Sequence, residues 1–234
     1  VIAYRSFPSL EGALLELLHE PSIYCRENAM QALYTTGDAD CIMRAIKIID
    51  KSDMFFHGKL FCDGLLNFAG SSRILGEKII EAFPSFSVEM RVTLLDYLRF
   101  SSGEYREFAL SLLQNTESDD EIRYAAIRYL GKYRFNKAYE LLCSLAAEKF
   151  GQKWQYSAIA STALSAYPGN GTVHILKKNL YSRNWYIRLN SAVSLKNLGI
   201  TYPELIDGND RYASEITRYC LQREDTDKRE AVHT

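Results

Sequence analysis

The sequence has no long apolar run: no stretch approaches the roughly 18 uninterrupted apolar residues that a membrane-spanning helix requires. Its first residues also lack the charged and then apolar pattern of a secretory signal. Both absences favour a soluble chain. Because the sequence begins with Val1 rather than methionine, we also expect a fragment of a longer protein, whose missing part could carry a membrane anchor.

Cysteine is also scarce. The 234 residues include five cysteines, an odd number, and no two of them have the C-x-x-C spacing of many metal sites. Cys25 and Cys62 fall at positions that we expect to face a core, where cysteine acts as a small apolar residue. The pattern indicates neither a disulfide framework nor a structural metal, and it favours a reducing, cytoplasmic compartment.

Catalytic motifs are missing as well. The sequence has no G-x-S-x-G and no phosphate-binding glycine loop, and the residues 169–171, Gly-Asn-Gly, follow Pro168 as in a turn. The histidines lie far apart and never at the i, i+4 spacing of a helical metal pair. They are His19, His57, His174 and His233. We therefore predict a non-enzymatic protein without a metal or a cofactor.

What the sequence does contain is a repeated helical pattern. In residues 182–199, Ile187, Ser191, Leu195 and Leu198 fall on one side of a helix. The underlying spacing is a cation, a small or apolar residue three positions on, and Leu seven positions on. It recurs at steps of 31 to 34 residues. The cation column reads Arg26, Lys59, Arg91, Arg123 and Arg188, with Ser157 in the fifth unit.

A period of this length, with two antiparallel helices per unit, is typical of α-solenoids. No stretch alternates apolar and polar residues long enough to indicate a strand. We predict an all-α fold, a right-handed superhelix of about six repeats forming one domain over residues 1–234. The predicted parts are repeats over 8–37, 38–70, 71–102, 103–134, 135–169 and 170–199, a cap over 202–223 and a frayed tail over 224–234.

Two segments carry a resemblance to a known family. Residues 119–133, DDEIRYAAIRYLGKY, and residues 182–199 resemble second helices of HEAT repeats, specifically short bacterial repeats related to those of bilin lyases. In that family a turn Asp precedes an apolar residue and Arg, followed by Ala and Leu. Ile122-Arg123 with Asp119 or Asp120 follows the pattern, as does Ile187-Arg188 with Asn184. In other units Pro21, Met54 and Ser85 stand near the place of the turn Asp. The resemblance implies a HEAT-like fold and says little about activity.

Three kinds of enzyme are built on similar arrays. Deoxyhypusine hydroxylases bind iron through several His-Glu pairs, whereas this sequence has only His19-Glu20. Alkylpurine DNA glycosylases use a basic face with Trp and an Asp, but no Asp lies between residues 121 and 206. Bilin lyases require a pigment cavity, whose residues the pattern does not identify. A lyase or glycosylase activity therefore ranks third among the predicted functions.

Charge is distributed unevenly along the chain. Residues 1–120 contain 11 Lys and Arg against 18 Asp and Glu, a net charge of −7. Residues 121–199 contain 12 against 3, a net charge of +9, and residues 200–234 contain 5 against 8, a net charge of −3. Aromatic residues are interleaved with the basic ones, which is typical of surfaces that bind acidic protein segments or polyanions. The candidate basic patch consists of Lys132, Lys153, Arg183, Trp185 and Lys196.

The most favoured function is a scaffold that binds a protein or peptide in the concave groove of the array. The alternative is binding of a nucleic acid or another polyanion through residues 121–199. We expect the cation column to be structural, with its guanidinium groups bonded to turn carbonyls or to neighbouring carboxylates. The residues predicted to face the groove are Tyr24, Asn28, Gln31, His57, Phe61, Glu89, Asp96, Glu121, Arg128, Tyr186 and Asn190.

Overall fold

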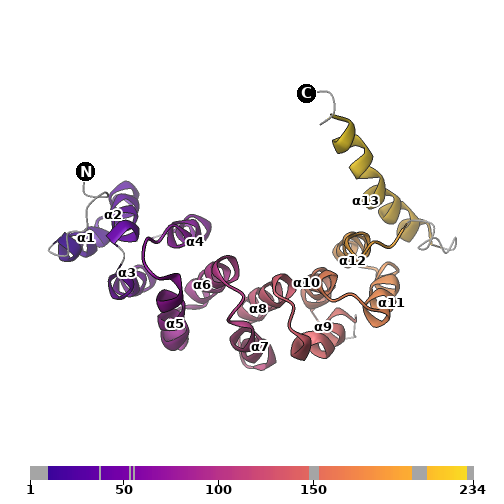
Figure 1. The fold of residues 1–234 in the computed structure, drawn as a ribbon, viewed down its shortest axis with the longest axis horizontal. Helices are drawn as coiled ribbons and strands as arrows, with labels where there is room; N and C mark the ends of the chain where they lie inside the picture. Colours follow the sequence, from indigo (N-terminus) through magenta and orange to yellow (C-terminus); the bar gives the residue numbers. More distant parts are fainter. Residues whose placement is uncertain are drawn as a thin grey trace. The chain divides into compact units, whose positions relative to one another are not determined.

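The computed structural model describes residues 10–36, 38–52, 54, 56–147, 153–201 and 210–230, with residues 36 and 221–230 described through the backbone alone. All regular structure within these ranges is helical (Figure 1). The predicted all-α class is therefore confirmed for the described part of the chain. In the same part, no helix combines the length and the apolar character needed to cross a bilayer.

Each of the six predicted repeats contains two α-helices, and a final helix follows them. The α-helices are α1 (Glu11–Glu16), α2 (Ile23–Thr36), α3 (Ala39–Lys51), α4 (Gly58–Leu66), α5 (Ser72–Ala82), α6 (Val88–Ser101), α7 (Arg106–Gln114), α8 (Asp120–Lys132), α9 (Tyr139–Ala146), α10 (Trp154–Ala163), α11 (Asn170–Asn179), α12 (Trp185–Asn197) and α13 (Arg211–Glu230).

Short polar side chains start several of these helices. A helix leaves its first backbone N–H groups without intrahelical partners, and a side-chain oxygen at the N-cap satisfies them. Asp38 accepts from the N–H groups of Asp40 and Cys41 at the start of α3. Asn184 does the same for Tyr186 and Ile187 at the start of α12. Asn184, which stands in the place of the turn Asp in the sequence pattern, is thus the N-cap of α12.

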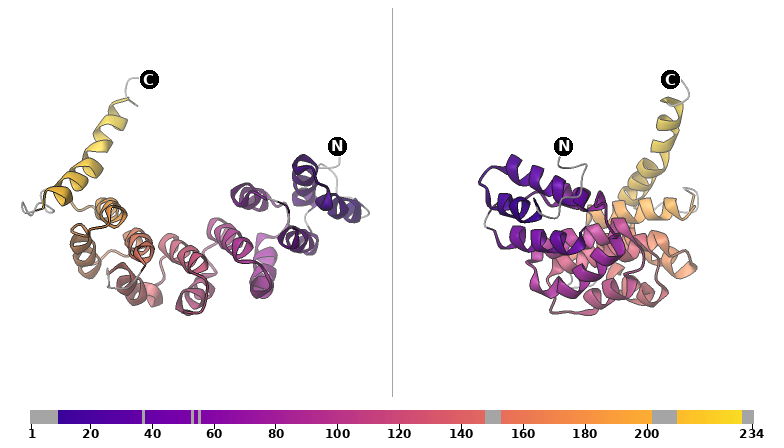
Figure 2. Two further views of the ribbon diagram at one scale, coloured as in Figure 1. Left: turned by 180° about the vertical axis from the view of Figure 1, so that it is seen from behind. Right: turned by 60° about the vertical axis from the view of Figure 1, so that its left-hand side comes forward.

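The chain divides into two compact units, and the division passes through α7 and α8. Unit 1 consists of Val1–Phe108 and Glu117–Ala125, and unit 2 of Ala109–Thr116 and Ala126–Thr234. In unit 1, α3 packs on α1 and α5, while α4 packs on α2 and α6. In unit 2, α9 packs on α11, and α12 packs on α10, α11 and α13. Each unit thus stacks helices in two layers, which Figure 2 shows from two further sides. The single domain and the superhelix remain predictions.

Several contacts within the units join residues that lie one period apart. The Arg44 guanidinium lies 3.3 Å from the Glu11 carboxylate, 33 residues away. In unit 2, the side-chain N–H groups of Asn179 and Asn190 each donate to a backbone carbonyl at 2.9 Å, those of Ala146 and Ala158, 33 and 32 residues away. Consecutive helix pairs are therefore neighbours in these stretches.

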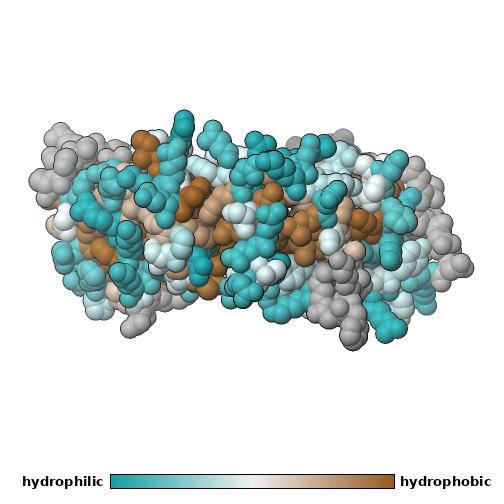
Figure 3. Space-filling model, turned by 90° about the horizontal axis from the view of Figure 1, so that it is seen from below, coloured by the Kyte–Doolittle hydropathy of each residue, from teal (hydrophilic) through white to brown (hydrophobic). Residues whose placement is uncertain are grey.

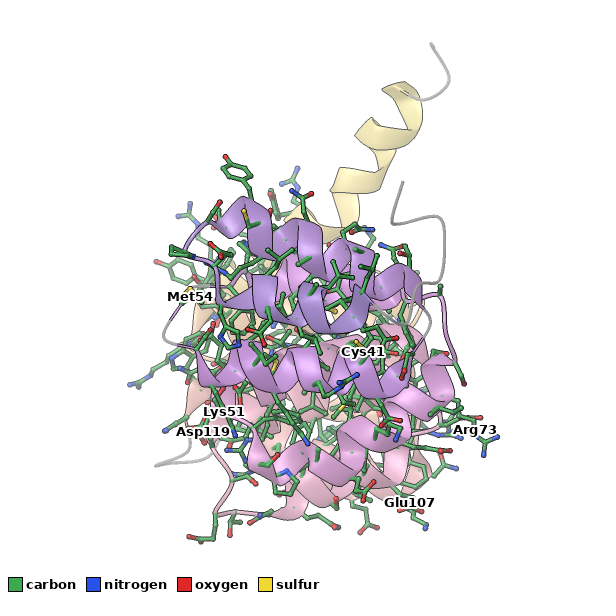
Figure 4. All side chains as sticks on the ribbon, turned by 90° about the vertical axis from the view of Figure 1, so that its left-hand side faces the viewer. Cys41, Lys51, Met54, Arg73, Glu107 and Asp119 are labelled. Atoms are coloured by element: carbon green, nitrogen blue, oxygen red, sulfur yellow. The ribbon has the colours of Figure 1, made fainter. Side chains whose placement is uncertain are left out.

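The buried faces match the apolar pattern of the sequence. In α12, Ile187, Ser191 and Leu195 are fully buried, and the small residues let a neighbouring helix approach closely. Cys41, labelled in Figure 4, is also fully buried. Burial raises the pKa of its thiol to about 11 and that of Cys62 to about 12, as expected for cysteines in an apolar surrounding. On the face drawn in Figure 3, hydrophilic side chains surround the apolar patches.

One prediction about a single residue is wrong, and one segment has a longer helix than expected. Cys25 is exposed and does not face the core, because it lies in the first turn of α2, where residues 22–25 are all exposed. Residues 224–230, predicted as part of a frayed tail, have a helical backbone that continues α13. The sequence from residue 211 to residue 230 has no Gly or Pro to end the helix, and its Arg, Lys and Glu residues are good helix formers. The predicted start of the cap, residues 202–209, and the tail beyond residue 230 lie outside the described residues.

Candidate functional site

Two members of the cation column, Arg26 and Arg188, bond carbonyls of the turns that precede their helices. Arg26 Nη1 donates to the carbonyls of Glu20 and Pro21 at 2.8 and 2.9 Å. Arg188 Nε donates to the carbonyl of Ser182. In the fifth repeat, where Ser157 takes the place of the cation, its Oγ donates to the Leu145 carbonyl at 3.2 Å. Arg91 and Arg123 are half-buried, whereas Lys59 is exposed.

In unit 1, three of the predicted groove residues lie together. Gln31, His57 and Phe61 line a cavity between α2 and α4, which we call the α2–α4 cavity. Asp96 is half-buried on α6 and forms an ion pair with Arg99 at 2.9 Å. The remaining predicted groove residues of unit 1 are exposed: Tyr24, Asn28, Glu89 and Glu121.

In unit 2, the predicted groove residues have different surroundings. Tyr186 is exposed on α12 and stacks on Trp154, with the ring centroids 5.1 Å apart and the planes at 15°. Asn190 is half-buried, and its side chain is used in the bond to the Ala158 carbonyl. Arg128 is also half-buried. Tyr186 is therefore the exposed aromatic residue of this set.

The predicted basic patch consists of residues with different roles. Lys196 Nζ donates to the Cys220 carbonyl at 2.9 Å and so joins α12 to α13. Lys132 lies beside its neighbour Tyr133, with Nζ 5.4 Å from the ring centroid. Lys153 is exposed immediately before α10. Arg183 and Trp185 line a groove between α12 and α13, so this pair is the part of the patch that contributes to a concave surface.

This α12–α13 groove is an open cleft of about 580 Å³. It is lined by Arg183, Trp185, Arg188, Tyr212, Glu215, Ile216 and Tyr219. Three of its aromatic rings are largely exposed: Trp185 at 56%, Tyr212 at 71% and Tyr219 at 56%. Beside it, Trp185 and Tyr186 form a T-shaped pair, with the ring centroids 5.3 Å apart and the planes at 81°, and Tyr186 stacks on Trp154. We call Trp154, Trp185 and Tyr186 the aromatic cluster, and Trp185 belongs to both surfaces.

The packing of α13 on α12 creates the groove. One face of α13 is buried and packs on α12. Its buried residues are Ala213, Ile216, Thr217 and Cys220. Residues 212, 216 and 219 follow the i, i+4, i+7 spacing of one helical stripe, so Tyr212 and Tyr219 stand on either side of Ile216. The two tyrosines therefore border one continuous surface with Trp185.

Electrostatic contacts hold the first turn of α13. The Ala213 N–H donates to Asp210 Oδ1 at 3.0 Å, and Arg188 Nη1 lies 3.4 Å from the same oxygen. The backbone hydrogen bond and, secondarily, the Arg188 guanidinium lower the pKa of Asp210. The Arg188 guanidinium also lies over Tyr212, 5.7 Å from its ring centroid. Arg188 thus connects the repeat column to the groove.

We expect α13 to loosen from α12 in acid. A carboxyl group whose pKa is lower in the folded state stabilises the fold above its unfolded pKa of about 3.9 and loses this effect as the pH falls through the folded value. In a Trp154→Phe background, the fluorescence of Trp185 should therefore change between pH 5 and pH 2.5. Asp210→Ala should give the acid-type emission already at pH 6. An emission that is the same over this range, or unaffected by the substitution, would contradict this role of Asp210.

Sequence reasoning missed the contribution of α13. Tyr212, Glu215, Ile216 and Tyr219 lie beyond the last repeat, in a segment expected only to cap the array. The available signal was the helical stripe of Tyr212, Ile216 and Tyr219. The contact of Trp154 with Tyr186 had a clearer signal, because the two residues are 32 positions apart, which is one period.

The described residues contain no group of three or more His, Cys, Asp or Glu side chains placed to hold a metal ion. Comparisons with known proteins are also silent about activity, since no protein-family model and no curated protein matches the sequence.

Proposed function

We propose that this chain is a non-enzymatic scaffold of HEAT-like repeats, and that its unit 2 binds an acidic polypeptide segment in the α12–α13 groove. The observation that carries the proposal is the exposure of Trp185, Tyr212 and Tyr219 beside Arg183 in one cleft. Trp, Tyr and Arg are the residue types that dominate the binding energy of protein interfaces. A concave surface that gathers them is well suited to take the anchor residues of a partner.

The repeat pattern supports the scaffold part of the proposal. Steps of 31 to 34 residues, two helices per step and bonds between residues 32 or 33 positions apart are features of stacked helical repeats. We further propose that the repeats continue through both units as one right-handed superhelix. Such arrays present extended surfaces that suit polypeptide partners better than small substrates.

The charge of the groove favours an acidic partner. Glu215 is paired with Arg211 at 2.7 Å, so its carboxylate is already balanced by a neighbour on α13. Arg183 is exposed, and its guanidinium can bind a carboxylate through two parallel hydrogen bonds. The surrounding residues 121–199 carry a net charge of +9, which attracts an acidic segment from a distance.

The aromatic cluster supports a second candidate function. Trp154 and Tyr186 form a stacked pair, and the exposed cations Lys153 and Arg183 lie one and three residues before them in the sequence. Aromatic platforms flanked by cations bind single-stranded nucleic acids by stacking and by phosphate contacts. The apolar floor that Ile216 gives the neighbouring groove favours a polypeptide, because a base does not need an aliphatic contact there.

Selection from a phage-displayed library of random dodecapeptides tests the proposal. We expect the enriched peptides to combine at least two Asp or Glu residues with an apolar or aromatic anchor. In parallel, fluorescein-labelled dT15 and rU15 should bind more weakly than a selected peptide at 150 mM salt. Enrichment of basic peptides, or tighter binding of the oligonucleotides, would overturn the assignment of an acidic polypeptide.

A further inference from the structure

The α2–α4 cavity of unit 1 is a separate concave site. It has a volume of about 320 Å³ and lies between α2, α4 and the segment that joins α3 to α4. Met54, labelled in Figure 4, lies in this joining segment. Cavities of this size fall in the range that proteins use for small molecules. It is lined by Ile23, Arg26, Glu27, Met30, Gln31, Tyr34, Ile49, Ser52, Met54, Phe56, His57, Leu60, Phe61, Asp63, Gly64 and Asn67.

The inner wall of the cavity is largely apolar and aromatic. Phe56 meets the edge of Phe61 with the ring centroids 5.7 Å apart and the planes at 67°. Tyr34 is buried against α4, and its ring lies so close to Gly64 that a Cβ there would be 2.3 Å from Tyr34 Cε2. Aromatic faces attract organic cations as well as apolar groups. The wall therefore accepts an apolar body that carries a positive charge.

The two acidic groups of the cavity are available for a ligand. Glu27 on α2 and Asp63 on α4 are exposed, and their carboxylates accept no hydrogen bond and form no ion pair among the described residues. By contrast, Arg26 directs Nη1 to the Glu20 and Pro21 carbonyls and lies 3.2 Å from Met54 Sδ. His57 Nδ1 accepts from the Leu60 N–H at 3.4 Å, as the N-cap of α4.

We propose that the α2–α4 cavity binds a small organic amine, an ammonium group attached to an aryl or alkyl body. The carboxylates of Glu27 and Asp63 bind the ammonium group, and Tyr34, Phe56 and Phe61 surround the body. An apolar cavity of about 150 Å³ holds benzene, so about 320 Å³ suits a ligand of roughly 10 to 12 non-hydrogen atoms. Residues 1–120 carry a net charge of −7, which complements a cation. This site is independent of the function proposed for unit 2.

Three probes that share one body and differ in charge test the proposal. They are 4-phenylbutylamine, 4-phenylbutan-1-ol and 4-phenylbutyrate, and their affinities can be measured by calorimetry. We expect the amine to bind at least about tenfold more tightly than the alcohol, and the carboxylate to bind most weakly. Absence of binding by all three probes would overturn the proposal. A preference for the carboxylate would also overturn it, because the ligand would then bind to the Arg26 guanidinium and not to the carboxylates.

Two sets of variants locate the binding. The double substitution Glu27→Gln and Asp63→Asn should reduce the affinity for the amine to that for the alcohol while leaving the alcohol unaffected. The matched control is Glu16→Gln with Glu81→Gln, which removes the same charge from exposed positions outside the cavity and should retain the tenfold preference. Leu60→Trp, at an exposed lining position, should block all three probes. Equal loss of preference in both double variants would show a general charge effect and contradict the site.

Discussion

Replacing Gly131 by valine is expected to lower the free energy of unfolding of unit 2 by about 2–3 kcal/mol. Gly131 on α8 lies against Ala163 of α10, and a Cβ at this glycine would be 2.8 Å from both the Cα and the Cβ of Ala163. Part of the obstacle is backbone, which cannot rotate away as a side chain can. Either α8 and α10 must move apart, or the valine side chain must adopt an unfavourable rotamer. Both responses reduce the stability of the packed helices.

Urea unfolding followed by tryptophan fluorescence measures this effect selectively, because both tryptophans of the chain, Trp154 and Trp185, belong to unit 2. The matched control is Gly12→Val on α1, where a Cβ would meet nothing within 4 Å. Valine is a slightly better helix former than glycine, so the control should leave unit 1 unchanged or gain a few tenths of a kcal/mol. Far-UV circular dichroism of the same titration measures this, because unit 1 has no tryptophan. A fluorescence transition that is the same in Gly131→Val and in the parent chain would contradict the close packing of α8 on α10.

The second large effect concerns Trp185. Trp185→Ala should weaken binding of a selected acidic peptide by about 30-fold or more, the loss expected for an aromatic residue at the centre of an interface. Trp185 borders the α12–α13 groove and also contacts Tyr186, so its removal affects both aromatic surfaces. Because its side chain is 56% exposed, the helical content and the stability of unit 2 should change little.

Phe100→Ala is the control for Trp185→Ala. Phe100 lies on α6 of unit 1 and is 50% exposed, so the substitution removes a comparable amount of exposed aromatic surface outside the groove. Isothermal titration with the same peptide should give the parent affinity for this variant. Equal affinities for Trp185→Ala and Phe100→Ala would show that the groove is not the binding surface.

The sequence predicts the helices well because local rules determine them. The period places two helices in each repeat. Short polar residues such as Asp38 and Asn184 cap the N-termini of the helices that follow them. The column of cations was likewise visible, and Arg26 and Arg188 bond carbonyls of the preceding turns. These features depend on neighbours close in sequence or one period away.

The candidate sites were only partly visible, because they depend on how individual segments pack. Asn190 and Lys196 are polar residues at positions expected to bind a partner, yet both bond backbone carbonyls of neighbouring helices. The aromatic residues Tyr212 and Tyr219 lie beyond the repeats, and only the docking of α13 brings them to Trp185. The repeat period also predicted Gln31, His57 and Phe61 as groove residues. The cavity around them could not be predicted, because its wall is completed by residues that precede α4, among them Met54 and Phe56.

Photo-crosslinking tests the central claim most directly. A benzoylphenylalanine introduced at position 212, in the α12–α13 groove, is compared with one at position 24, an exposed tyrosine of α2 in unit 1. With a selected acidic peptide, we predict a covalent adduct at position 212, competed by unlabelled peptide, and no competed adduct at position 24. A competed adduct at position 24 without one at position 212 would contradict the assignment of the partner-binding site to the α12–α13 groove.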